Sequence, residues 1–177
     1  MARGHSSKPA IARPADGVGR FRSLTLGTPP PIVGEVAELD KIRWFIPTED
    51  DQRRIREAAK RIFATRPAIL AGYLYGSAAR LRKPARDIDI GLLVSDPLAI
   101  DLHALAEQLA DETGLQIVPF DVRLLNGGGP VYLHEVLYVG QRIYEADPEA
   151  RIAFEARAVS RWLDFKPYWE RLREAVF

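Results

Sequence analysis

The residues of this chain best suited to chemistry lie between positions 75 and 89. Gly76-Ser77 ends one apolar run, and Asp87 and Asp89 flank a single isoleucine inside a second apolar run. In an extended strand, residues two apart point to the same face, so these two carboxylates are expected to project together. Paired carboxylates raise each other's pKa unless a cation lies between them. Mg²⁺, which often shares such a site with substrate phosphates, is a natural occupant.

The Gly-Ser dipeptide adds phosphate-binding potential to the acidic pair. Glycine lets a backbone approach a phosphate closely, and serine supplies a hydroxyl and an amide donor. An isolated Asp-x-Asp is more typical of a solvated strand edge or turn, because short motifs have many false positives. In this chain, however, only the aspartates interrupt an apolar strand sequence, where unpaired carboxylates are costly. The combined pattern therefore predicts a site for a metal–nucleotide complex.

This pattern resembles the signature of the nucleotidyltransferase superfamily of DNA polymerase beta, in which Gly-Ser and Asp-x-Asp are separated by about ten residues. Nine residues separate Gly76-Ser77 from Asp87 in this chain, and Arg86 stands where relatives often have serine. Both departures could shift the loop and alter nucleotide affinity. Arg80 lies where small members of this family often have an arginine. The resemblance thus implies that Gly76, Ser77 and Arg80 bind the nucleotide.

The resemblance runs from about Pro47 to the C terminus and is closest to the minimal nucleotidyltransferases, the antitoxin partners of HEPN-domain ribonuclease toxins. It implies a third carboxylate on a later strand, for which Asp121 is the candidate. Asp87, Asp89 and Asp121 would then be the catalytic residues and would hold one or two Mg²⁺ ions, with ATP as the substrate. A structural alternative is that Asp121 only pairs with Arg123, because i,i+2 neighbours on a strand share a face.

The resemblance implies an enzyme that transfers AMP from ATP to a tyrosine hydroxyl of a HEPN-type protein toxin and thereby acts as an antitoxin. About 130 residues follow the N-terminal leader, enough for a catalytic core and little else, which favours an acceptor that docks by itself. Two alternatives stay open. One is a non-catalytic antitoxin that neutralises its partner by complex formation. The other is a small-molecule nucleotidyltransferase of the aminoglycoside-modifying kind.

Size and composition limit the number of domains, the kinds of partner and the cellular compartment that are expected for this chain. A chain of 177 residues suits one domain with a real core and a tail. The net charge of +1 argues against broad electrostatic capture of nucleic acid, and no direct nucleic-acid binding is expected. Neither a membrane-length apolar run nor a signal sequence is evident, so no membrane partner is expected. The absence of cysteine excludes disulfides and fits a cytoplasmic protein.

Composition also distinguishes an N-terminal extension from the rest of the chain. Residues 1–34 contain five basic residues against one acid, with glycines and a triple proline between them. Such a segment does not support a packed core. We therefore expect a disordered or loosely attached extension over residues 1–46 and a nucleotidyltransferase domain over residues 47–177.

Apolar patterns predict an α/β fold, in which a small mixed β-sheet is packed with helices. Apolar and alternating runs predict strands at residues 68–75, 87–94, 115–125 and 141–145. Helical periodicity predicts helices at residues 48–63, 97–113 and 131–139, and from 148 onward. Thr48 and Asp51 predict a capping box at the start of the first of these helices. A further short helix could begin at Ser77, which would direct free backbone amides toward a phosphate. The sheet is expected to present the three aspartates along one edge of a cleft.

Three expectations about the helices are specific enough to test. The helix after the Asp96 cap should bury Leu98 on its apolar stripe and should end at Gly114. Pro167 should break or kink the last helix, which is expected to carry an apolar stripe of its own. Aromatic residues near this end have two open interpretations, closure of the core or a partner-binding surface. They are Trp162, Phe165, Tyr168 and Trp169.

Overall fold

The structure is a computed structural model that describes residues 44–176. The extension expected over residues 1–46 therefore lies almost entirely outside the described residues. At the start of the described range, Phe45 and Ala85 exchange two backbone hydrogen bonds, of 3.0 and 2.8 Å. This bridge places the chain before the first helix beside the loop that leads into the acidic strand. Within residues 44–176, none of the helices combines the length and apolar character that a membrane span requires.

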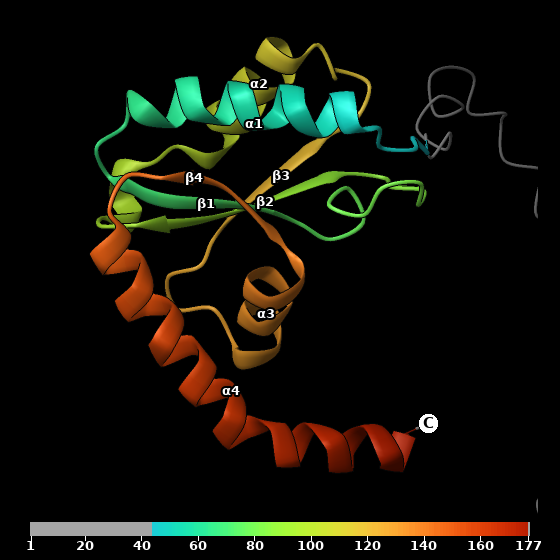
Figure 1. Cartoon of the computed structure of the whole chain (residues 1–177), viewed down its shortest axis with the longest axis vertical. Helices are drawn as coiled ribbons and strands as arrows, with labels where there is room; N and C mark the ends of the chain where they lie inside the picture. Colours follow the sequence, from blue (N-terminus) through green and yellow to red (C-terminus); the bar gives the residue numbers. More distant parts are fainter. Residues whose placement is uncertain (1–43, 177) are drawn as a thin grey trace, which may run out of the picture. The chain divides into compact units, whose positions relative to one another are not determined.

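Four strands form one mixed sheet in the order β3-β2-β1-β4 (Figure 1). They are β1 (Ile69–Tyr75), β2 (Ile88–Val94), β3 (Phe120–Leu124) and β4 (Gln141–Glu145). β1 pairs antiparallel with β2 and with β4, whereas β2 and β3 run parallel. The predicted small mixed sheet is confirmed. The third strand is shorter than predicted, because residues 115–118 form a turn closed by a hydrogen bond from the Val118 amide to the Leu115 carbonyl (3.1 Å).

Helices cover both faces of the sheet (Figure 1). One face packs against α1 (Glu49–Ala64) and α2 (Leu102–Thr113), and the other against α3 (Pro130–His134), the π-helical η2 (Glu135–Val139) and α4 (Pro148–Val176). Successive strand residues alternate between the two cores. Ile88, Ile90 and Leu92 of β2 pack toward α1 and α2, while Leu93 packs toward α3 and α4. Asp89 therefore faces the α3 side of the sheet.

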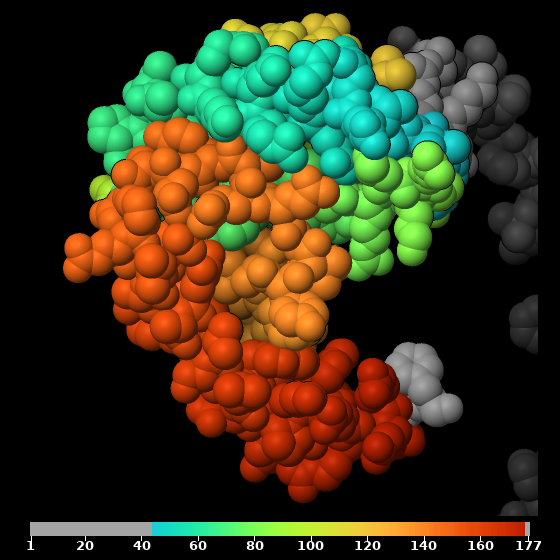
Figure 2. Space-filling view, in the orientation of Figure 1, coloured from blue at the N-terminus to red at the C-terminus, as the bar shows by residue number. Residues whose placement is uncertain are grey.

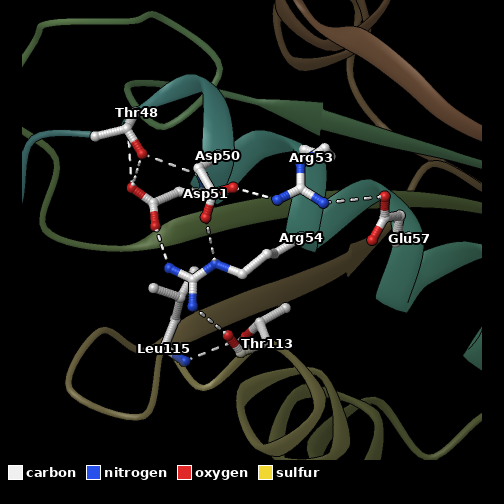
Figure 3. A network of polar contacts seen from close by, with 8 residues as sticks. All are labelled: Thr48, Asp50, Asp51, Arg53, Arg54, Glu57, Thr113 and Leu115. Atoms are coloured by element: carbon white, nitrogen blue, oxygen red, sulfur yellow. Dashed lines mark hydrogen bonds and ion pairs between the residues drawn. The ribbon is translucent and has the colours of Figure 1, made fainter.

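A polar network joins the start of α1 to the end of α2 (Figure 3). The predicted capping box is confirmed, since the Thr48 hydroxyl accepts from the Asp51 amide (3.2 Å) and Asp51 accepts from the Thr48 amide (3.0 Å). Arg54 donates to Asp51 (2.6 Å) and to the carbonyl of Thr113 (2.9 Å). This contact fixes the two helices on the same face of the sheet.

The helix predicted after Asp96 begins later than expected. Asp96 caps only the short 3₁₀ turn η1 (Pro97–Ala99), and Asp101 starts α2 by accepting from the amides of residues 103 and 104. Leu98 is consequently 95% exposed, so its predicted burial was wrong. Leu109 is buried, and Gly114 ends α2 in the left-handed conformation as predicted (φ +67°).

α4 continues through Pro167 as one helix of 29 residues that bends along its length (Figure 1). The helix is not broken, and its bend agrees with the kink that was the other outcome predicted for Pro167. The apolar stripe expected on this helix is exposed, because α4 turns a different face, which includes Phe154 and Ala158, toward the core. The predicted stripe consisted of Ile152, Ala156, Val159 and Leu163. The second half of the helix projects beyond the other elements (Figure 2). Val159 and Leu163 are 54% and 61% exposed, whereas Ala158 is buried.

The first half of α4 is anchored by a charged cluster at the sheet edge. The buried Tyr73 of β1 donates its hydroxyl to Glu155 of α4 (2.6 Å). Arg151 pairs with both Glu155 and Glu145, the last residue of β4. These contacts tie α4 to two strands of the sheet and leave its second half projecting beyond them.

Asn126 joins the ends of β2 and β3. Its side-chain oxygen accepts from the Val94 amide (3.0 Å), and its side-chain nitrogen donates to the Val94 carbonyl (2.8 Å). The Leu125 amide also donates to the Leu92 carbonyl (2.8 Å). This double contact imitates a ladder pair and keeps the parallel register of the two strands.

We therefore expect Asn126→Ala to lower the free energy of unfolding by about 1–3 kcal/mol, because two partly buried backbone groups of Val94 lose their partners. Urea unfolding at neutral pH measures the change. Gln116→Ala is the control, since this exposed side chain makes one surface hydrogen bond to Asp111 (2.9 Å) and should cost little. Equal losses in the two variants would contradict this role of Asn126.

Candidate active site

The Gly-Ser segment forms a turn at the end of β1. Gly76 adopts φ +67°, a conformation that side chains rarely adopt. The following residues form turns, closed by a hydrogen bond from the Arg80 amide to the Ser77 carbonyl (3.0 Å), in place of the short helix expected at Ser77. Ser77 is partly buried and Arg80 is exposed. The turn thus keeps its backbone close to the sheet while the arginine faces outward.

Two glutamines hold this turn in place. Gln52 of α1, which is only 7% exposed, donates to the Ala78 carbonyl (3.0 Å). Gln141 of β4 donates to the Ala79 carbonyl (2.8 Å) and lies within 3.4 Å of the Gln52 side-chain oxygen. Three elements that are far apart in the sequence therefore converge on the turn. No sequence motif indicated this role for the glutamines.

The sheet brings the acidic residues together. Asp89 of β2 is the register partner of Asp121 on β3 and of Tyr75 on β1. Neighbouring strands lie about 4.8 Å apart, so register partners present their side chains side by side on one face. Asp87 precedes Asp89 by two residues and extends the same row. All three carboxylates are partly buried.

The charges around Asp89 are not balanced. Burial, followed by the negative charges of Asp87 and Asp121, raises the pKa of Asp89 to about 6. Glu135, at the start of η2, adds to the same effect, and Arg123 opposes it. An excess of negative charge at oxygen ligands is the electrostatic pattern of a cation-binding site.

Asp121 is engaged by Arg123, as the structural alternative predicted. The Arg123 Nε donates to Asp121 Oδ2 (2.9 Å), and a second guanidinium nitrogen contacts the same oxygen. In the described part of the chain, no three acidic or histidine side chains are arranged to hold a metal ion as they stand. The donor set nevertheless suits Mg²⁺, because Asp87, Asp89 and Asp121 offer carboxylate oxygens on one face of the sheet. The fit requires Asp121 to leave Arg123.

Two tyrosines lie in the site without having been predicted there. The rings of Tyr75 and Tyr132 meet edge to face, with centroids 5.7 Å apart. Among residues 44–176, neither buried hydroxyl has a hydrogen-bond partner. Burial raises the pKa of both groups, so both stay protonated. A tyrosine directly before the Gly-Ser turn was the only sequence signal, and nothing in the sequence linked it to Tyr132.

Arg86, one of the two departures from the family signature, lies outside the acidic cluster. Its guanidinium carbon sits 4.2 Å from the ring centroid of Trp44, a cation–π contact. Ala85 on one side of it is held by Phe45, and Asp87 on the other side begins the acidic row. Arg86 therefore fastens the loop before β2 to the chain that precedes α1.

A groove runs from the Gly-Ser turn toward α4. Its first part, of about 480 Å³, is lined by residues that include Arg80, Glu135 and Trp169. A more apolar cleft between η2 and α4, of about 340 Å³, shares several of its lining residues. Among the shared residues, the His134 ring stacks on Trp162 with centroids 4.1 Å apart. The terminal aromatics therefore include groove-lining side chains as well as the largely exposed Tyr168.

Gly76 is required both for its positive φ and for the room that it leaves to Asp89, and a comparison of two alanine substitutions separates these effects. A β-carbon at this position would overlap the Asp89 carboxylate, in addition to the strain of its positive φ. We expect Gly76→Ala to lose about 2–4 kcal/mol of unfolding free energy, from strain and overpacking together. It should also weaken Mn²⁺ binding, because Asp89 is displaced. Urea unfolding and Mn²⁺ titration measure the two effects.

Gly127 provides the matched control for this substitution. It has φ +74°, yet a β-carbon there would meet nothing within 4 Å. Gly127→Ala should therefore lose only about 1 kcal/mol, from backbone strain, and should bind Mn²⁺ like the wild type. Similar losses in both variants would show that the Asp89 contact does not matter.

The raised pKa of Asp89 predicts a pH-dependent loss of stability in the metal-free protein. An ordinary aspartate titrates at 3.8, whereas folded Asp89 titrates at about 6, so the folded state binds the proton more tightly. Stability attributable to this group is therefore highest below pH 3.8 and falls until the pH exceeds about 6.

Asp89→Asn removes this ionisation and should stabilise the chelator-treated protein by about 1–3 kcal/mol near pH 8, with the gain shrinking toward about pH 4. Urea unfolding across this pH range measures it. Asp96→Asn is the control, because an exposed cap position accepts asparagine equally well. A gain that does not depend on pH would refute the electrostatic explanation.

Solved structures with the same fold come from toxin–antitoxin complexes. One is a tri-AMPylated Shewanella oneidensis HEPN toxin in complex with MNT antitoxin, at 20% identity and TM-score 0.52, covering 71% of this chain and 98% of that chain. A mutant MntA–HpeT toxin–antitoxin complex matches at 18% identity and TM-score 0.54, covering 71% and 97%. A toxin–antitoxin structure with AMP-PNP matches at 18% identity and TM-score 0.50, covering 73% and 98%. At these identities the likeness is one of fold.

Family membership follows from the sequence together with this fold. No curated protein sequence is a match to this chain. Residues 57–149, more than half of the chain, match the family described as Polymerase beta, Nucleotidyltransferase. The matched range includes the Gly-Ser turn and all three aspartates. The chain therefore belongs to the polymerase beta nucleotidyltransferase family.

Proposed function

We propose that this nucleotidyltransferase transfers AMP from ATP to a tyrosine hydroxyl of a HEPN-type toxin, with Mg²⁺, and thereby acts as the antitoxin. The observation that supports it most is the row of Asp87, Asp89 and Asp121 on one sheet face, directly beside the Gly76 turn. The neighbouring solved structures add support, because one contains an AMPylated HEPN toxin and another contains AMP-PNP.

The residues of the site have separate roles in this reaction. The amides of the Gly76-Ser77 turn and the Ser77 hydroxyl are suited to bind the phosphates. Asp87, Asp89 and Asp121 would hold Mg²⁺, which when bound neutralises phosphate charge and lowers the pKa of the attacking hydroxyl.

The chemical step is a displacement at phosphorus. The tyrosine oxygen forms a bond to the α-phosphorus, the bond to the α–β bridging oxygen breaks, and pyrophosphate leaves. The hydroxyl proton passes to a carboxylate of the site, for which Asp121 is the candidate. Positioning and charge compensation supply most of the catalysis in such transfers, which agrees with a site that contains few groups other than carboxylates, an arginine and a turn.

The groove next to the turn suits a protein acceptor. It contains Arg80, and its continuation between η2 and α4 is lined by apolar and aromatic side chains. Its charged lining residues comprise three cations and two acids, a balance that does not favour a polycationic sugar as acceptor. This lining includes Val159 and Leu163, two apolar residues of α4 that are more than half exposed. Aromatic and apolar surfaces of this kind are typical of protein interfaces.

One observation favours a second function, an antitoxin that acts by binding alone. Asp121 is paired with Arg123, and among residues 44–176 no trio of acidic or histidine side chains stands ready for a metal. A chain that never releases Asp121 would keep the fold and lose the chemistry. The groove along α4 would then be its only functional surface.

Mass spectrometry of the co-purified complex tests the proposal. The experiment requires a candidate partner, which is a protein with an Arg-x4-His-x-Tyr motif whose gene lies beside the gene for this chain, and the two are co-expressed. With ATP and Mg²⁺, the partner should gain one or more adenylyl groups on tyrosine, and Asp89→Asn should reduce the initial rate at least about a hundredfold, the effect expected when a metal ligand is lost.

Asp96→Asn changes a cap residue beyond the end of β2 opposite to Asp89, and this variant should modify the partner at the wild-type rate. A stable complex in which the wild-type chain leaves the partner unmodified would favour the binding antitoxin. Modification that persists in Asp89→Asn would refute the assigned site.

A further inference from the structure

Arg123 lowers the pKa of Asp89 and so opposes the neighbouring carboxylates in the electrostatic balance of the site. It lies two residues after Asp121 on β3, so both side chains emerge on the same face. Two of its nitrogens contact a single carboxylate oxygen, Asp121 Oδ2. In turn, Asp121 and Asp89 raise the pKa of Arg123, with the hydrogen bond to Asp121 as the largest cause. The third carboxylate therefore already has a cation.

The guanidinium competes with a metal ion for this oxygen, because its two contacts use both lone pairs of Asp121 Oδ2. Mg²⁺ requires ligand oxygens at about 2.0–2.1 Å in near-octahedral geometry. A guanidinium that contacts Asp121 Oδ2 from the site face obstructs that approach and repels a divalent cation. Coordination of the metal through Asp121 Oδ2 therefore requires Arg123 to move.

Arg123 is free to make this move. Its side chain is 60% exposed, against 33% for Asp121, and it is long and unbranched. Exposed ion pairs contribute little net free energy, so the pair can separate at small cost. The planar guanidinium also matches the oxygens of a phosphate group, which offers a new partner close by.

We propose that Arg123 is a displaceable internal cation, which holds Asp121 in the ligand-free chain and exchanges it for the triphosphate when the metal–nucleotide complex binds. This inference rests on the proposed nucleotidyl transfer site and concerns how that site is loaded. It accounts for a paired third carboxylate in a chain that otherwise has the family's catalytic residues. Before the metal–nucleotide complex binds, the ion pair between Arg123 and Asp121 limits repulsion among the three carboxylates.

Mn²⁺ binding to the full-length chain without nucleotide, followed by electron paramagnetic resonance of free Mn²⁺, tests the proposal. Arg123→Gln should bind Mn²⁺ roughly tenfold more tightly, because a competing and repelling cation is gone. It should bind Mg²⁺–AMP-PNP more weakly by a similar factor, because the phosphate partner is lost. Arg123→Lys keeps the positive charge but loses the planar guanidinium with its two parallel donors. This variant should bind Mn²⁺ more tightly than the wild type but less tightly than Arg123→Gln.

Arg61→Gln is the matched control. Arg61 is also a surface arginine paired with a carboxylate, Glu112, and its side chain is 58% exposed, close to the value for Arg123. Arg61 belongs to α1 and Glu112 to α2, and both helices lie on the opposite face of the sheet from Arg123. Arg61→Gln should leave Mn²⁺ and AMP-PNP affinities unchanged.

The wild-type chain provides a measurement that needs no folded variant. The Nε–H resonance of Arg123, assigned by its loss in Arg123→Lys, should shift when Mg²⁺–AMP-PNP saturates the chain. An unshifted resonance at saturation overturns the proposal. So does an Mn²⁺ affinity that is unchanged in Arg123→Gln, equal to wild type in Arg123→Lys, or undetectable in all variants.

These readouts separate the inference from the proposed function. Metal and nucleotide binding that follow the expected pattern support the displaceable cation even if no acceptor is ever modified. If AMP is transferred to an acceptor while the Mn²⁺ affinity of the chain does not depend on residue 123, the proposed function is supported. The proposal that Arg123 is a displaceable cation is then refuted.

Discussion

Crowding of like charges on one face of the sheet constrains the rest of this structure. Parallel pairing of β2 with β3 sets Asp89 beside Asp121, and the strand period sets Asp87 in the same row. Each carboxylate raises the free energy of its ionised neighbours, and partial burial adds to the effect at Asp89. The arrangement persists because apolar side chains on the opposite face of the same strands, such as Ile88 and Ile90, are fully buried under α1 and α2.

The surrounding contacts keep this row accessible while fixing its position. Gly76 leaves room for the Asp89 carboxylate, and Gln52 and Gln141 attach the following turn to α1 and β4. Arg123 supplies a positive charge from the neighbouring strand. A site of this kind trades stability for function, since clustered carboxylates repel one another and are also the groups suited to a divalent cation.

Local patterns predicted most of the elements and failed where nonlocal packing decides. The capping box of Thr48 and the left-handed Gly114 depend on neighbouring residues, and both were predicted correctly. Leu98 was assigned to a buried stripe because periodicity cannot tell that a second cap, Asp101, restarts the helix. The stripe on α4 was likewise expected to be buried, but periodicity cannot tell which face of a helix packs, and the face with Phe154 and Ala158 does so.

The sequence by itself determined the chemical identity of the site: a glycine-serine turn and two aspartates on one strand face, because backbone geometry relates residues two apart without any tertiary contact. Only the tertiary structure decided that Asp121 lies beside Asp89, since parallel pairing brings together residues more than thirty positions apart in the chain. The tertiary structure also decided that Arg123 forms an ion pair with Asp121, and that Gln52 and Gln141 hold the Gly76-Ser77 turn. These contacts depend on strand register and on which helices cover each face, and no local pattern encodes either.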